Sequence, residues 1–294
     1  LFRVFMSQIQ SQLIDFTVRT GMTIAAESWG NPAESAVLLV HGGGQTRHSW
    51  GGTAEILAEQ GWYAASYDQR GHGYSARPTD KDYSTIRFAE DLVDVCEELR
   101  KITGSAPVVV GASLGGQASL LAEGILRPGC CSAIVLVDIT PRMEQVGVDR
   151  ILQFMLERAE TGFGSLEEAA DAIAQYQPHR RRPADMSGLA HSLRLDSDGR
   201  WRWRWDPNIL LGPLPIGTGA DSEVFIEATL ALTVPTLLIR GRMSDLVSEE
   251  TAQEFLDLRP DAKFVDVSGA GHMVAGDKND HFTSAIEDFL NTLA

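Results

Sequence analysis

The sequence predicts an α/β fold: a mostly parallel, eight-stranded sheet flanked by helices and interrupted by an inserted helical cap. Six short apolar runs lack polar alternation, which is typical of strands that are buried on both faces of a parallel sheet. Segments with helical periodicity alternate with these runs, an order that produces open, doubly wound sheets. After the strand predicted at Ala133–Val137, which is the sixth when an edge hairpin is counted, this alternation stops for about 95 residues. The interruption indicates an insertion.

Each predicted core element has its own signal. Gln12–Arg19 and Met22–Trp29 flank a turn at Gly21 and predict an antiparallel hairpin on one edge of the sheet. The remaining strands are expected at Ala36–Val40, Tyr63–Tyr67, Val108–Val110, Ala133–Val137, Thr236–Ile239 and Lys263–Val267. The core helices are expected at Ser49–Gln60, Ser84–Ile102, Gln117–Leu126, Glu249–Leu258 and Asp280–Leu293.

The insertion predicts a mainly helical cap at residues 139–233, with residues 1–138 and 234–294 forming the core. Its helices are expected at Glu144–Ala159, Leu166–Tyr176, Met186–Leu195 and Asp221–Leu230. A cap at this point would cover the carboxyl edge of the sheet, where open α/β folds bind ligands. Trp201, Trp203 and Trp205 alternate with arginines, which predicts an extended segment whose tryptophans pack the cap against the core.

Composition excludes several function classes. A net charge of −15 argues against nucleic acid and anionic membrane surfaces as partners. No apolar run approaches the roughly 20 residues that span a bilayer, and Leu1–Ser7 lacks the core of a signal peptide, so we expect a cytoplasmic protein. The three cysteines, Cys96, Cys130 and Cys131, have no framework or zinc spacing, which predicts buried thiols, no metal and no cofactor.

The segment Pro107–Gly116 carries the strongest chemical signal. Gly111-Ala-Ser-Leu-Gly115 follows an apolar strand and precedes a helix, the pattern of a nucleophile elbow. In such a turn the serine backbone is strained, and glycines two residues to either side leave room for neighbouring backbone. Ser113 is therefore the predicted nucleophile.

A serine hydroxyl needs a base, and that base needs an orienting carboxylate. His272 follows the last predicted strand on a glycine-rich loop, and it is the predicted base. Asp245, after the Thr236–Ile239 strand, is the predicted acid. Asp138, at the end of the preceding strand, is the competing candidate for the acid. If Asp245 is the acid, we expect the carboxylate of Asp138 to hold the entrance of the cap.

Glycine-rich backbone follows the first parallel strand at His41-Gly-Gly-Gly44. Successive glycines allow amide N–H groups to point at a tetrahedral oxyanion. The predicted donors are the amides of Gly43 and Leu114, with Gly44 as the alternative to Gly43. We expect His41, Arg70 and His72 to hold these loops rather than to act on substrate.

These motifs together resemble the α/β-hydrolase superfamily, in its capped group of carboxylesterase-, haloperoxidase- and epoxide hydrolase-like enzymes. The resemblance covers nearly the whole chain and rests on His41–Gly44, Asp68–Ser75, Gly111–Gly115, Gly241–Asp245 and Gly271–His272. It implies the order Ser…Asp…His of this fold. Epoxide hydrolases and haloalkane dehalogenases of the group carry aspartate at the elbow, whereas Ser113 suits acyl transfer.

The sequence therefore predicts a serine hydrolase that cleaves a small ester, thioester or lactone through an acyl-enzyme. Two alternatives use the same residues: a C–C bond hydrolase and a cofactor-free perhydrolase. A ligand-binding receptor of the same fold is the alternative from another class. The cap resembles the superfamily least, so the substrate does not carry over.

Overall fold

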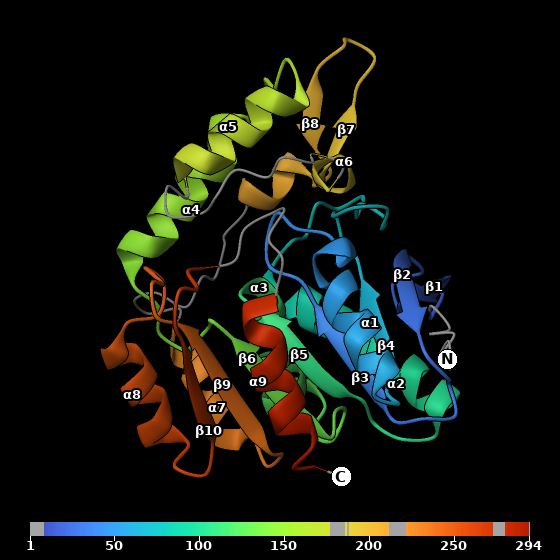
Figure 1. Ribbon diagram of the computed structural model, residues 1–294, viewed down its shortest axis with the longest axis vertical. Helices are drawn as coiled ribbons and strands as arrows, with labels where there is room; N and C mark the ends of the chain where they lie inside the picture. The colour runs from blue at the N-terminus through green and yellow to red at the C-terminus, as the bar shows by residue number, and fades with distance from the viewer. Residues whose placement is uncertain (1–8, 177–185, 187, 212–221, 273–279, 294) are drawn as a thin grey trace, which may run out of the picture.

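An eight-stranded sheet forms the centre of the protein in a computed structural model that describes residues 9–176, 186, 188–211, 222–272 and 280–293 (Figure 1). The strand order is β1-β2-β4-β3-β5-β6-β9-β10. The strands are β1 (Gln12–Thr17), β2 (Thr23–Trp29), β3 (Ala36–Val40), β4 (Tyr63–Tyr67), β5 (Val108–Ala112), β6 (Ala133–Val137), β9 (Thr236–Gly241) and β10 (Lys263–Val267).

The sheet is parallel except at the edge that the first two strands, β1 and β2, form. β1 pairs antiparallel with β2, and β2 pairs antiparallel with β4, whereas the other neighbours run parallel. The predicted edge hairpin and the predicted mostly parallel sheet are confirmed. Because β5, β6, β9 and β10 are parallel neighbours, the loops that follow them meet at one edge of the sheet.

Helices cover both faces of this sheet, as predicted. The core helices are α1 (Gly51–Glu59), α2 (Thr85–Thr103), α3 (Leu114–Leu121), α7 (Ser222–Ala231), α8 (Glu249–Leu258) and α9 (Asp280–Leu290), with a 3₁₀ turn η1 (Arg47–Trp50) before α1. The predicted helix Gln117–Leu126 begins earlier and changes at Ala122 into a π-helical turn, η2 (Ala122–Leu126).

Alternate residues of the central strands feed two separate hydrophobic cores. Leu38 and Val40 of β3 face one core, together with Phe88 of α2 and Phe255 of α8. Val37 and Leu39 of β3 face the other, where α1 and α9 supply the packing (Figure 1). This period-two division of a continuously apolar strand is the reason why the sequence shows no polar alternation there.

The cap stands over the carboxyl edge of the sheet (Figure 1). It contains α4 (Gln145–Glu157), α5 (Leu166–Tyr176), α6 (Leu189–Ser192), the hairpin β7 (Leu193–Leu195)–β8 (Trp201–Trp203) and the 3₁₀ turn η3 (Pro207–Leu210). The predicted helix at Met186–Leu195 is wrong over its last three residues. They form a strand because they pair with Trp201–Trp203.

Helix α7 belongs to the layer on the sheet, although the sequence-based division placed it in the cap. It packs against α3, α8 and η2. The approach is close, because a Cβ added at Gly124 of η2 would lie 2.2 Å from the carbonyl oxygen of Ala228 in α7. The cap in the described structure therefore ends before α7.

The tryptophan segment is extended and packs inward, as predicted. Trp203 and Trp205 are buried, and Trp201 is half-buried. The arginines between them make polar contacts on the cap, for example from Arg202 to Asp196 and Asp198. A run that could suggest nucleic acid binding thus serves packing in this fold.

Within the described ranges, no helix combines the length and apolar character required to cross a membrane.

Candidate active site

Ser113 occupies a sharp turn between β5 and α3. Its φ of 47° and ψ of −115° lie in a region that residues with a side chain rarely adopt. Such a conformation persists only where the surroundings enforce it, and it is characteristic of a nucleophile elbow. The turn places Ser113 directly before the first turn of α3, where free amide groups gather.

Glycines on both sides make this turn possible. A Cβ added at Gly111 would lie 2.6 Å from the carbonyl oxygen of Gly115, and one added at Gly115 would lie 2.6 Å from that of Val40. Both approaches are shorter than real carbon–oxygen contacts. The spacing Gly-x-Ser-x-Gly therefore reflects how closely β5, α3 and β3 approach one another.

His272 follows β10 and makes a hydrogen bond with Asp138, the residue that follows β6. Its Nδ1 atom lies 2.8 Å from Oδ2 of Asp138, and both side chains are buried. An Nδ1–H that donates to the carboxylate leaves Nε2 as the basic nitrogen. His272 and Ser113 line the same pocket.

Two further donors fix the carboxylate of Asp138. The hydroxyl of Ser244 donates to Oδ2 at 2.7 Å, and the amide of Gly241 donates to Oδ1 at 3.0 Å. The backbone of Asp138 has a φ of 52°, which turns the side chain at the end of β6. Sequence reasoning missed Ser244, whose signal was its place beside the predicted acid.

The prediction that Asp245 orients His272 is wrong. Asp245 instead forms an ion pair with Arg150 of cap helix α4, with 2.8 Å between Nη1 and Oδ2. The loop after β9 directs the neighbouring Ser244 toward Asp138, and this places Asp245 on the side that faces the cap. Asp138 and Asp245 thus exchange the two parts that the sequence assigned to them.

The glycine loop after β3 has one amide that is free to bind an oxyanion. The amide of Gly42 donates to Oε1 of Gln45 at 2.8 Å, and the amide of Gly44 donates to Nε2 of His72 at 3.1 Å. Among the described residues, neither the amide of Gly43 nor that of Leu114 has an acceptor. The predicted pair remains available, whereas the alternative donor Gly44 is already engaged.

Two buried histidines hold this loop in place, and their hydrogen bonds fix the tautomer of each ring. In His41, Nδ1 lies 2.7 Å from the carbonyl oxygen of Gly42, and Nε2 accepts from the amide of Gln69 at 3.0 Å. In His72, Nδ1 lies 3.0 Å from the carbonyl oxygen of Arg70. Burial lowers the pKa of His41 to about 4 and that of His72 to about 3. Both rings are therefore neutral near pH 7 and fit the expected supporting roles.

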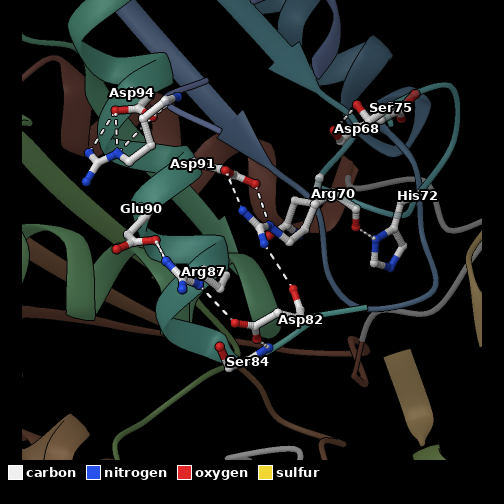
Figure 2. Close-up of polar contacts among 12 residues, drawn as sticks. Asp68, Arg70, His72, Ser75, Asp82, Ser84, Arg87, Glu90, Asp91 and Asp94 are labelled. Atoms are coloured by element: carbon white, nitrogen blue, oxygen red, sulfur yellow. Dashed lines mark hydrogen bonds and ion pairs between the residues drawn. The ribbon is translucent and has the colours of Figure 1, made fainter. Parts of the chain in front are cut away.

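Charged residues anchor the loop that carries His72 (Figure 2). Arg70 makes a two-pronged contact with Asp91 of α2, with both nitrogen–oxygen distances at 2.7 Å. Asp68 accepts from the amide of Arg47 at 2.7 Å and from that of Tyr74 at 2.9 Å. This loop is thereby fixed to α2 and to η1, and it in turn fixes Gly44.

The cap is bonded to the same loop. The amide of Gly73 donates to the carbonyl oxygen of Arg204 at 2.6 Å, and the amide of Asp206 donates to that of Gly71 at 2.8 Å. The hydroxyl of Tyr83 also donates to Oδ2 of Asp206 at 2.7 Å. The cap segment that follows β8 is thus held next to His72 and the glycine loop.

An apolar pocket opens between this catalytic edge and the cap. Ser113, Gln117 and His272 form its polar part, together with the backbone of Gly43 and Gly44. Its apolar wall consists of Leu114, Met143, Val148, Ile151, Leu152, Phe154, Met155, Trp203, Trp205, Ile209, Leu210 and Leu246. Within the described part of the chain, no charged side chain lines it.

Comparison with known proteins agrees with this fold. A sequence model of the alpha/beta hydrolase fold matches residues 35–278. The chain is 30% identical to an esterase of Mycobacterium tuberculosis, Rv0045c, over 92% of this chain and 87% of that protein. It is 29% identical to a 2-(acetamidomethylene)succinate hydrolase of Mesorhizobium japonicum, over 76% of this chain and 77% of that protein.

Solved structures show the same fold. A crystal structure of E-2-(acetamidomethylene)succinate hydrolase superposes with a TM-score of 0.81 at 22% identity and covers 96% of this chain and all of that one. The esterase Rv0045c superposes with a TM-score of 0.74 at 26% identity and covers 97% of this chain and 92% of that one. These relatives support a hydrolase enzyme, and the chain belongs to the α/β-hydrolase fold family.

Proposed function

We propose that the protein is a serine hydrolase that cleaves small, uncharged carboxylic esters, with thioesters and lactones in the same chemical class. The observation that carries this proposal is the Asp138–His272 hydrogen bond of 2.8 Å at the edge of the pocket that Ser113 lines. The triad is then Ser113, His272 and Asp138. It keeps the order Ser…Asp…His in the chain.

Each triad member has a defined role in the proposed reaction. His272 Nε2 takes the proton of Ser113 as its Oγ attacks the ester carbonyl carbon, and Asp138 stabilises the imidazolium that forms. The imidazolium then protonates the departing alkoxide, which leaves as alcohol. Water, deprotonated by His272, attacks the acyl-enzyme and releases the carboxylic acid and free Ser113.

The oxyanion of both tetrahedral intermediates would be held by two amides. Gly43 and Leu114 are the proposed donors, because their N–H groups lack an acceptor among the described residues. Amides that are already oriented need no reorganisation when charge develops on the carbonyl oxygen. Leu114 also begins α3, whose N-terminal end favours negative charge.

The pocket wall supports the choice of an uncharged substrate. A carboxylate transferred into an apolar pocket loses its hydration, and it binds only where a cation or several donors replace the water. Among the described lining residues, no lysine or arginine offers this. We therefore favour neutral esters with an apolar acyl or alcohol group over dicarboxylates such as the one named for the Mesorhizobium relative.

C–C bond hydrolysis is the second candidate, because the chain is 27% identical to a 2-hydroxymuconate semialdehyde hydrolase of Pseudomonas putida. The same serine, base and oxyanion donors would act on a ketone carbonyl. Perhydrolysis would use hydrogen peroxide in place of water. A receptor would bind ester and turn it over at a negligible rate.

A substrate panel separates these functions. Neutral p-nitrophenyl esters of increasing acyl length, a dicarboxylate monoester, a vinylogous diketone, and acetate with peroxide are assayed on wild type and on Ser113→Ala. We expect turnover of the neutral esters and a loss of roughly 10⁴–10⁶-fold in kcat for Ser113→Ala. Ser105→Ala, at an exposed loop serine, is the matched control and should retain full activity. Ester turnover that survives in Ser113→Ala would refute the proposal.

A further inference from the structure

A second cluster of reactive side chains lies far from Ser113, at the opposite edge of the sheet. It consists of Glu123 in η2, Cys96 in α2, and Cys130 and Cys131 in the loop that precedes β6. All four side chains are buried, at no more than 3% exposure each. The proposed hydrolysis uses none of them.

Two oxygen–sulfur distances in this cluster match those between ligands of a tetrahedral metal site. Oε2 of Glu123 lies 3.4 Å from Sγ of Cys130 and 3.4 Å from Sγ of Cys131. All three ligand atoms fall within 4.8 Å of one another. With Zn–S of about 2.3 Å and Zn–O of about 2.0–2.2 Å, two tetrahedral ligands are about 3.5 Å apart.

The carboxylate of Glu123 is also held as metal-binding carboxylates are. The amide of Gly129 donates to Oε1 at 2.7 Å, and the amide of Cys131 donates to Oε2 at 3.1 Å. Such outer hydrogen bonds fix the orientation of a ligand and remain compatible with a metal on another lone pair. They therefore keep an oxygen aimed between the two sulfurs.

A third thiol and a positive charge complete the surroundings. The buried thiol of Cys96 lies near that of Cys130, and the two act on each other electrostatically, so a third sulfur stands close to the three ligands. Arg100, one turn further along α2, contacts the carbonyl oxygen of Gly129 and acts electrostatically on Cys130. Its charge offsets part of the excess negative charge of two thiolates and a carboxylate around a divalent ion.

We propose that Glu123, Cys130 and Cys131 bind one soft divalent metal ion of the Zn²⁺ type, with Cys96 as a third sulfur nearby. On binding, the metal–sulfur bonds form as Cys130 and Cys131 each release the thiol proton to solvent, and no electrons are transferred. The spacing of the cysteines along the chain did not predict zinc. The fold brings Cys96 and the adjacent pair together because α2 packs against η2.

Such a site would join α2, η2 and the start of β6, so its effect would fall on stability rather than on ester turnover. A metal that binds only the folded chain stabilises it by an amount that grows with the logarithm of the metal concentration divided by Kd. The strand ends that carry Ser113 and Asp138 lie at the other edge of the sheet, which separates the two sites.

Cobalt titration tests the proposal on the intact wild-type protein. The reduced, metal-free protein is titrated with Co²⁺ under anaerobic conditions. We expect a near-ultraviolet thiolate-to-cobalt charge-transfer band that saturates at one equivalent and disappears when Zn²⁺ is added. The sequence holds three cysteines, so such a band can come only from this cluster. A folded wild-type protein that shows no band would overturn the proposal.

Variants assign the ligands. Cys131→Ser should lose the band, and Glu123→Gln should weaken Co²⁺ binding at least tenfold. His272→Ala is the control, because a metal bound at the hydrolytic site would be lost there while the cysteine band remains. Zn²⁺ should raise the Tm of wild type and leave that of Cys131→Ser unchanged. If the thiols form a disulfide in air, seen as a loss of two mass units, and ignore Zn²⁺ when reduced, the site is not a metal site.

Discussion

Nδ1 of His272 lies 2.8 Å from Oδ2 of Asp138, although 134 positions separate the two residues in the chain. The contact joins the ends of β10 and β6, which lie on either side of β9 in the sheet. The carboxylate that contacts His272 therefore follows the strand after the elbow strand in the sequence. The carboxylate after β9, Asp245, belongs to the contact between core and cap.

The two carboxylates give opposite predictions on substitution. Asp138→Asn should lower kcat for neutral esters by roughly 10³–10⁴-fold, because an asparagine no longer stabilises the imidazolium or selects the tautomer. Asp245→Asn should change kcat less than tenfold, since it removes only a partly exposed ion pair with Arg150. Steady-state kinetics of both variants decide the matter, and a larger loss in Asp245→Asn would restore the sequence-based assignment.

Gly115→Ala should destabilise the protein by about 1–3 kcal/mol, as overpacking does. The new Cβ would meet the carbonyl oxygen of Val40 at 2.6 Å, so β3 and α3 would have to separate. Urea unfolding of wild type and variant measures the difference. Gly52→Ala is the matched control, because nothing lies within 4 Å of its added Cβ and it stands in helix α1. It should stabilise the protein by about 0.5–1 kcal/mol.

Acid should destabilise the glycine loop through His41 and His72. Their pKa values, about 4 and about 3, lie below the value near 6.5 of an unfolded histidine. Below pH 6.5 the unfolded chain binds more protons, so the contribution is complete above that pH and is lost as the pH falls toward 4. Between pH 7 and pH 5.5 the two residues should remove about 2–3 kcal/mol from the free energy of unfolding.

The variant His72→Gln isolates half of this effect. Its amide oxygen can accept from Gly44 in place of Nε2, and it does not titrate. The loss of unfolding free energy between the same two pH values should fall by about 1 kcal/mol relative to wild type. An unchanged pH dependence would mean that His72 can be protonated in the folded state.

The preference of the enzyme for acyl-chain length should depend on Leu210 and not on the neighbouring Leu211. Leu210 lines the pocket from η3, whereas Leu211 is 74% exposed. Leu210→Trp should lower kcat/KM for long acyl esters at least tenfold and affect acetate esters little, because the larger ring occupies the space of the acyl chain. Leu211→Trp should leave both unchanged. Equal effects of the two variants would place the acyl chain elsewhere.

The core and the sharp turn at Ser113 were predictable because their signals are local. Continuous apolar runs, helical periodicity and Gly-x-Ser-x-Gly each lie within a few residues, and strands, elbow and hairpin followed from them. The carboxylate beside His272 was not, since Asp138 and Asp245 follow adjacent parallel strands. A turned backbone at Asp138 and the hydroxyl of Ser244 decide between them, and neither has a sequence signature.

The remaining differences have the same origin. Leu193–Leu195 reads as the end of a helix, yet its pairing with β8 across a short turn makes it a strand. Helix α7 lies within the residues that the sequence assigned to the insertion, yet it packs on the core, where Gly124 of η2 admits its backbone. The convergence of Cys96 with Cys130 and Cys131 depends on helix packing that no spacing rule describes.

Two backbone hydrogen bonds, one donated by Gly73 to Arg204 and one accepted by Gly71 from Asp206, tie the part of the cap just after β8 to the loop that carries His72. Trp205 pairs with His72, whose Nε2 accepts from the amide of Gly44, whereas Ile151 and Leu152 line the pocket from α4. Substitutions that change the substrate range should therefore disturb the glycine loop less when they fall on the pocket residues of α4 than when they fall on Trp203 or Trp205. Libraries that diversify α4 should yield more active enzymes than libraries of equal size at β8.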